Sequence, residues 1–169
     1  MQDSTDYILH KLSEILIDKK WKIVVAESCT GGGVAKAMTS LPGSSAWFDR
    51  GMVTYSNESK MELLNVSAST LELYGAVSIE TANEMAQGAL NNSHAQVSLS
   101  VTGIAGPDGG TKDKPVGTVC FAWTALNHTV LNAMMNFTGD RMAIREQAIM
   151  MAIQGVFEMM EKMGERQNT

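Results

Sequence analysis

The stretch Val24-Val25-Ala26-Glu27-Ser28-Cys29-Thr30-Gly31-Gly32-Gly33 joins two patterns that decide the fold. Residues 23–26 are apolar, continuous and mostly β-branched, which is typical of a short buried strand. After the glycines, apolar residues recur at helical spacing until Pro42-Gly43 ends the pattern. A strand that passes through a glycine turn into a helix leaves unpaired amide N–H groups at the positive end of the helix dipole. Such a turn can hold a phosphate or a developing oxyanion, and Ser28 lies at its mouth.

The same turn also has a purely structural interpretation. Glycines after a strand are often only a tight connection, and a Ser or Thr before a helix is often only an N-cap. The spacing fits neither a Walker loop, nor the Gly-x-Gly-x-x-Gly dinucleotide motif, nor the Gly-x-Ser-x-Gly elbow of hydrolases. The stretch by itself therefore leaves both a connection and a functional site open.

The composition bounds the class of protein. The chain has 169 residues, of which 44% are hydrophobic and 18% charged, and we expect one globular domain over residues 1–169. The net charge of −5 argues against broad nucleic-acid binding, which needs a basic surface. No apolar run reaches membrane-spanning length, and the N-terminus lacks the pattern of a signal peptide. We therefore expect a cytoplasmic protein that binds neither nucleic acid nor a membrane.

The cysteines and histidines predict neither a disulfide framework nor a metal site. Cys29 and Cys120 are too few for a framework, although Cys29 shares the turn with Ser28 and is an alternative nucleophile. None of the three histidines has a second ligand at metal-binding spacing, and none lies within a candidate motif. We therefore expect no metal and no Ser–His–Asp triad.

The remaining periodicities predict helices and strands in alternation. We expect helices over residues 5–18, 57–64, 67–74, 81–90 and 140–163, and strands over residues 51–55, 96–101, 116–124 and 129–137. Strands that alternate with helices early and pair as a hairpin late predict an α/β layered sandwich around a mixed sheet. The chain has 13 methionines, several of them in the last helix, which indicates core filling, with a homo-oligomer interface as the second interpretation.

Three further stretches could converge on the turn at Ser28, and the first follows the second predicted strand. It reads Tyr55-Ser56-Asn57-Glu58-Ser59-Lys60, and strand ends are where α/β folds place functional groups. Lys60 could act as the base for Ser28 if burial or neighbouring positive charge lowers its pKa from about 10.4 toward neutrality. Tyr55 could relay or donate a proton. The alternative for Lys60 is a solvated lysine on a helix, and the alternative for Tyr55 is an ordinary aromatic residue of a strand.

The other two stretches carry groups that suit an anion. In the loop over residues 102–111, which begins at Thr102, glycines allow backbone N–H groups to approach a ligand closely. Its alternative is a flexible loop around a Pro-Asp-Gly-Gly turn. Arg141 and Arg145 lie one turn apart on the last predicted helix, which suits a phosphate or a carboxylate. Their alternative is a surface ion pair with a neighbouring glutamate.

Four motifs occur together and in order, and they resemble a known family. They are Glu27-Ser28-Cys29-Thr30-Gly31-Gly32, Val53-Thr54-Tyr55-Ser56-Asn57-Glu58 with Lys60, Thr102-Gly103-Ile104-Ala105-Gly106-Pro107-Asp108-Gly109-Gly110 through Lys114-Pro115-Val116-Gly117-Thr118-Val119, and Gly139-Asp140-Arg141 with Arg145. Over nearly its whole length the chain resembles the C-terminal domain of the competence/damage-inducible CinA-type proteins, known as nicotinamide mononucleotide amidohydrolases. Some family members carry an additional N-terminal domain, and this chain resembles the stand-alone form.

The resemblance implies a fold, an activity and residue roles. It implies a three-layer α/β/α sandwich, a bacterial origin, and deamidation of nicotinamide mononucleotide to nicotinate mononucleotide and ammonia in pyridine nucleotide recycling, without metal or organic cofactor. Ser28 would be the nucleophile, Lys60 the base and Tyr55 a relay, with amides around residues 30–32 stabilising the oxyanion. The substrate-binding residues would be Thr30, Gly31, Gly32, Asn57, Thr102, Gly103, Arg141 and Arg145. A non-catalytic nucleotide- or partner-binding module and an amidase for another small amide remain as alternatives.

Overall fold

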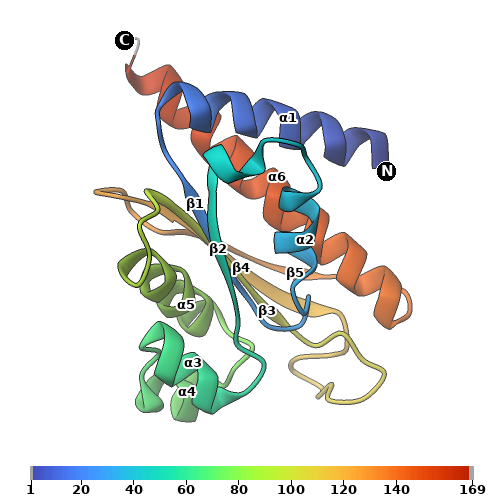
Figure 1. Ribbon diagram of the computed structural model, residues 1–169. Helices are drawn as coiled ribbons and strands as arrows, with labels where there is room; N and C mark the ends of the chain where they lie inside the picture. Colours follow the sequence, from blue (N-terminus) through green and yellow to red (C-terminus); the bar gives the residue numbers. More distant parts are fainter. Residues whose placement is uncertain (1, 168–169) are drawn as a thin grey trace.

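The structure is a computed structural model that describes the backbone of residues 2–167 and the side chains of residues 5–165. A five-stranded sheet lies between two layers of helices (Figure 1). The strands are β1 (Ile23–Glu27), β2 (Phe48–Val53), β3 (Val97–Gly103), β4 (Thr118–Ala125) and β5 (Leu131–Asn136). One layer of helices holds α1 (Gln2–Asp18), α2 (Gly33–Thr39) and α6 (Arg141–Gln167), and the other holds α3 (Asn57–Leu64), α4 (Ala68–Tyr74) and α5 (Ile79–Asn91). The predicted three-layer α/β/α sandwich is confirmed.

The sheet is mixed, as predicted. Its strand order is β2-β1-β3-β4-β5, in which β1 runs parallel to both β2 and β3 while β4 runs antiparallel to β3 and β5. All five residues of β1 are buried, because helices cover both faces of this interior strand. That burial explains why its sequence is a continuous apolar run and does not alternate.

The predicted bounds of the second strand are wrong. The strand begins at Phe48 and ends at Val53, so that Tyr55 lies beyond it. As an edge strand, β2 pairs only with β1 and exposes part of its surface, which allows the polar pair Asp49 and Arg50 within it. Because of these polar residues, the start of the strand does not show the apolar pattern by which strands are predicted.

Serine caps fix where the helices of the second layer begin. The predicted caps Ser67 and Ser78 are confirmed, since each side chain accepts a hydrogen bond from a backbone amide at 3.1 Å. Ser56 caps α3 in a reciprocal arrangement with Ser59. Because α3 therefore starts at Asn57, Lys60 lies in its first turn, where it is buried.

The methionines of α6 largely fill the core. Met159, Met160 and Met163 are buried among the residues packed between the sheet, α1 and α6, whereas Met142 is exposed. Core filling is therefore confirmed for these three side chains, and a homo-oligomer stays a prediction. No helix within residues 2–167 is long and apolar enough to cross a membrane.

The sheet brings the sequence motifs to one edge. β1, β2 and β3 are parallel to one another, so their carboxyl ends meet at the same side of the molecule. The segments that follow these strands are the glycine turn, the start of α3 and the long glycine loop. Functional groups in open α/β sheets lie at such an edge.

Candidate active site

The turn after β1 presents Ser28 at the carboxyl end of that strand. The Ser28 amide donates to the Val101 carbonyl of β3 at 3.0 Å, which continues the strand pairing up to the serine. Gly31 and Gly32 then adopt φ angles of +58° and +93°, a left-handed conformation that glycine reaches without strain. The chain thus reverses tightly between Ser28 and the first residue of α2.

The side chain of Glu27 closes this turn from within. Although it is fully buried, its carboxylate accepts four hydrogen bonds. The donors are the Thr30 hydroxyl at 2.6 Å and the backbone amides of Gly32 at 3.1 Å, Val34 at 3.0 Å and Ala35 at 2.8 Å. The start of α2 is therefore satisfied by a carboxylate of the protein itself.

The backbone amides of the turn are mostly engaged as well. The predicted oxyanion donors included Gly31 and Gly32, but the Gly31 amide donates to the Ser28 carbonyl at 3.0 Å and the Gly32 amide to Glu27. The amides of Cys29 and Thr30 donate to no oxygen atom among the described residues. These two amides are the ones that the turn leaves for a ligand.

Lys60 directly contacts Ser28. Its Nζ atom donates to Ser28 Oγ at 3.1 Å and to the Thr54 carbonyl at 2.7 Å, and its side chain is 2% exposed. Burial lowers the pKa of Lys60, because a charged ammonium group is disfavoured away from water. A buried amine in contact with a hydroxyl can serve as its base.

Tyr55 contacts Arg141 and leaves the contact with Ser28 to Lys60. Arg141 donates from Nη2 to the Tyr55 hydroxyl at 2.8 Å and from Nη1 to the Gly106 carbonyl at 2.7 Å. Tyr55 is 61% exposed, so this pair lies at the rim of the site. The guanidinium of Arg141 thus connects the segment after β2 with the long glycine loop.

A cavity of about 300 Å³ brings most of the predicted site residues together. Those that line it are Ser28, Tyr55, Asn57, Lys60, Thr102, Gly103 and Arg141. The Thr102 hydroxyl donates to the Ala76 carbonyl at 2.8 Å, which fixes the end of β3 against the segment before α5. The volume is at the lower end of what small-molecule sites occupy.

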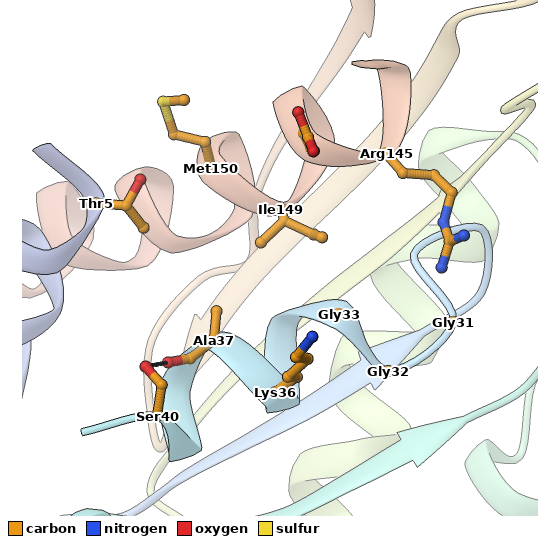
Figure 2. A pocket seen from close by; sticks show the side chains of 11 residues that line it. Thr5, Gly31, Gly32, Gly33, Lys36, Ala37, Ser40, Arg145, Ile149 and Met150 are labelled. Carbon is orange, nitrogen blue, oxygen red and sulfur yellow. Dashed lines mark hydrogen bonds between the residues drawn. The ribbon is translucent and has the colours of Figure 1, made fainter. Parts of the chain in front are cut away.

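Thr30, Gly31, Gly32 and Arg145 do not line this cavity. Arg145 lies behind the glycine turn, where its Nη2 atom donates to the Thr30 carbonyl at 2.9 Å (Figure 2). It lines a second cavity of about 630 Å³ between α2 and α6, together with Gly31 and Gly32. The two arginines predicted to share a ligand therefore lie at different cavities. Four helical residues advance α6 by about 6 Å, enough to bring Arg145 against the back of the turn.

Cys29 is poorly suited to be the alternative nucleophile. Its side chain is 5% exposed, and burial raises the pKa of the thiol to about 12. Because the thiolate is the reactive form, a thiol that stays protonated at neutral pH is inert.

Sequence reasoning missed the role of the Glu27 side chain. The signal was present, since an acidic residue closes an otherwise apolar buried strand. A buried carboxylate requires several hydrogen-bond donors, which the following small residues and amides provide. Asp108, which also lines the smaller cavity, was not singled out either, because a Pro-Asp-Gly-Gly sequence reads as an ordinary turn.

Comparisons with known proteins identify the family. The family model "CinA C-terminal domain" matches residues 5–160. The chain is 57% identical to the nicotinamide-nucleotide amidohydrolase PncC of Enterobacter agglomerans, covering 86% of this chain and 92% of that protein. It is 47% identical to the protein of the same name from Escherichia coli K12, covering 91% and 96%. The crystal structure of the competence/damage inducible protein CihA from Agrobacterium tumefaciens superposes with a TM-score of 0.89 at 41% identity, covering 91% of this chain and 94% of that one. The chain belongs to the CinA C-terminal domain family.

Proposed function

We propose that the chain is a nicotinamide-nucleotide amidohydrolase that converts nicotinamide mononucleotide to nicotinate mononucleotide and ammonia in pyridine nucleotide recycling. The observation that carries the proposal is the buried Lys60 amine at 3.1 Å from Ser28 Oγ, at the wall of a cavity of ligand size. The names of the two amidohydrolase relatives, which align over most of their length, supply the substrate class.

In the first half of the reaction, Ser28 is acylated. The neutral Lys60 amine takes the hydroxyl proton while Ser28 Oγ attacks the carboxamide carbon of the substrate. The amides of Cys29 and Thr30, which donate to no oxygen atom among the described residues, stabilise the oxyanion of the tetrahedral intermediate. Protonated Lys60 then returns its proton to the leaving nitrogen, the C–N bond breaks, and ammonia departs.

In the second half, water releases the acid. Lys60, again neutral, takes a proton from a water molecule that attacks the acyl carbon. The bond between that carbon and Ser28 Oγ breaks, Ser28 regains its proton from Lys60, and nicotinate mononucleotide leaves. The Thr54 carbonyl holds the Lys60 amine in place throughout, since it accepts a hydrogen bond from Nζ at 2.7 Å.

The rim of the cavity binds the ribose phosphate. Arg141 carries a positive charge at this rim, and its hydrogen bonds to Tyr55 and Gly106 fix the guanidinium there. Asn57, Thr102 and Gly103 also line the cavity, and we assign to them the contacts with the nucleoside. The expected cytoplasmic location fits the two free thiols, which persist in a reducing compartment.

The test is a substrate panel for ammonia release. We expect turnover of nicotinamide mononucleotide without added metal and in the presence of a chelator, because the Ser28–Lys60 pair supplies nucleophile and base. Nicotinamide riboside should be poorer by about a hundredfold in kcat/KM, since charge-assisted hydrogen bonds to the phosphate contribute about 1.5–3 kcal/mol each.

Three outcomes would contradict parts of this proposal. Ammonia release from no amide in the panel indicates a binding module, and preference for an unrelated amide indicates another amidase. Equal kcat/KM for the mononucleotide and the riboside shows that Arg141 does not bind a phosphate.

A further inference from the structure

Glu27 is a buried charged residue beside the nucleophile that the reaction steps do not use. It directly precedes Ser28 in the chain and is fully buried. A carboxylate withdrawn from water is tolerated only with several donors around it, and its four donors all come from the turn and the start of α2. Burial and hydrogen bonding thus hold one carboxylate against one short segment.

The backbone of Glu27 reaches the other half of the catalytic pair. Its carbonyl accepts a hydrogen bond from the Thr54 amide at 2.7 Å, and the Thr54 carbonyl in turn accepts one from Lys60 Nζ at 2.7 Å. The side chain of Glu27 therefore holds the turn that carries Ser28, while its main chain holds the residue that orients Lys60.

The carboxylate also decides which amides of the turn are free. Three amides that would otherwise face an incoming anion donate to Glu27, and those of Gly31 and Gly33 donate to carbonyls within the turn. Amides at the start of a helix attract phosphates and carboxylates. Because those amides already donate within the protein, they do not bind a substrate anion. The amides of Cys29 and Thr30 are the ones that can donate to it.

We propose that Glu27 is the positioning residue of the nucleophilic turn: its carboxylate saturates the amides at the start of α2 and so holds the amides of Cys29 and Thr30 toward the oxyanion. The inference rests on the proposed roles of Ser28 and Lys60. Because Glu27 acts through the turn and not on the substrate, its loss lowers kcat and leaves KM nearly unchanged.

The decisive variant is Glu27→Gln, which keeps the shape of the side chain. The glutamine amide has one acceptor oxygen in place of two, and its NH2 group faces backbone donors. We expect kcat for ammonia release from nicotinamide mononucleotide to fall by about ten- to a hundredfold, as when an oxyanion donor is misplaced. KM should change by less than about threefold, and the acidic limb of the pH profile should stay, because Lys60 sets it.

Glu84→Gln is the matched control. Glu84 also accepts a hydrogen bond at a helix start, from the Ser67 amide at 2.7 Å, but it lies outside the cavity. Its kcat should remain within about twofold of the unmodified protein. An equal fall in kcat for both variants would reduce the Glu27 effect to general destabilisation and overturn the inference.

Thr30→Val keeps the inference testable if Glu27→Gln does not fold. It removes a single donor to Glu27 at nearly constant volume, and we expect kcat to fall by about three- to tenfold. An unchanged kcat in Thr30→Val, or in folded Glu27→Gln, overturns the inference, and so does a KM that rises in proportion to the loss of kcat/KM. Ser28→Ala separates the two proposals: an active Ser28→Ala refutes the catalytic roles, whereas an inactive Ser28→Ala beside a fully active Glu27→Gln refutes only the role of Glu27.

Discussion

Two basic side chains reach the turn between β1 and α2 from opposite layers of the molecule. Lys60 comes from α3 and donates to the Ser28 hydroxyl at 3.1 Å, and Arg145 comes from α6 and donates to the Thr30 carbonyl at 2.9 Å. Burial lowers the pKa of Lys60, which lets the amine lose its proton, whereas a guanidinium stays protonated in proteins. On one side of the turn, therefore, Lys60 can act as a base, and on the other side Arg145 holds the backbone in place.

The two cavities beside the turn differ in volume and in the groups that line them. The one at Arg145 measures about 630 Å³ and the one at Lys60 about 300 Å³ (Figure 2 shows the former). The smaller cavity holds a hydroxyl in contact with a buried amine, the pair Ser28 and Lys60. Our proposal that the smaller cavity is the active site therefore rests on this pair of groups and not on the cavity volume.

The largest effect on activity should come from replacing either residue of the Ser28–Lys60 pair. Ser28→Ala and Lys60→Met should each lower kcat by at least about a thousandfold, and the double variant should be little worse than either, since residues that act as one unit are strongly non-additive. Steady-state ammonia release measures this, with circular dichroism as the check on folding. A folded Ser28→Ala that keeps near-normal turnover would contradict the mechanism.

The pH profile belongs to the same prediction. Lys60 works as a base only when deprotonated, and its pKa lies below the ordinary lysine value of 10.5. Activity should therefore rise with pH through the lowered pKa and level off before pH reaches that ordinary value. A limb at the pKa of a free lysine would show that the amine is not the base.

A smaller effect should separate Arg141 from Arg145. Arg141→Met should raise KM for the mononucleotide by about ten- to a hundredfold, through loss of charge-assisted bonds to the phosphate. Arg145→Met should leave KM within about threefold and instead lower the free energy of unfolding by about 1–2 kcal/mol, since it removes the bond to the Thr30 carbonyl. Thermal unfolding and kinetics on the same samples give both quantities. The reverse assignment of the two effects would place the phosphate on the Arg145 side.

The smallest effect is expected for Cys29→Ala. The thiol shares the turn with Ser28, but a pKa of about 12 keeps it protonated. We expect kcat/KM within about threefold of the unmodified protein, because only a small buried group is lost. A hundredfold loss, with the fold intact, would move the nucleophile from Ser28 to Cys29.

The sequence predicted the bounds of the buried strand β1 closely and misplaced those of the edge strand β2. β1 was predicted to within one residue, because both of its faces are covered and only apolar residues fit. The edge strand β2 was misplaced, because solvent on its open side allows Asp49 and Arg50. Element type thus followed from local pattern, whereas the bounds depended on neighbours that a pattern does not contain.

The candidate site, too, was predictable from the sequence only in part. That Ser28 and Lys60 stand near the ends of parallel strands could be anticipated, since such ends meet at one edge. Their direct contact joins residues 32 positions apart and depends on where α3 lies relative to the turn after β1, which no local pattern specifies. The separation of Arg141 from Arg145 likewise depends on where α6 crosses the turn, and their spacing alone suggested a shared ligand.

The two buried cysteines can report local unfolding of the two helical layers. Cys29 belongs to the core between the sheet and α6, and Cys120 packs under α5 in the opposite layer. Burial raises their pKa values to about 12 and 11, so a maleimide meets almost no thiolate until the covering layer detaches. The two labelling rates, separated by mass spectrometry of peptides, therefore report whether the layers open together or one after the other, without any introduced probe.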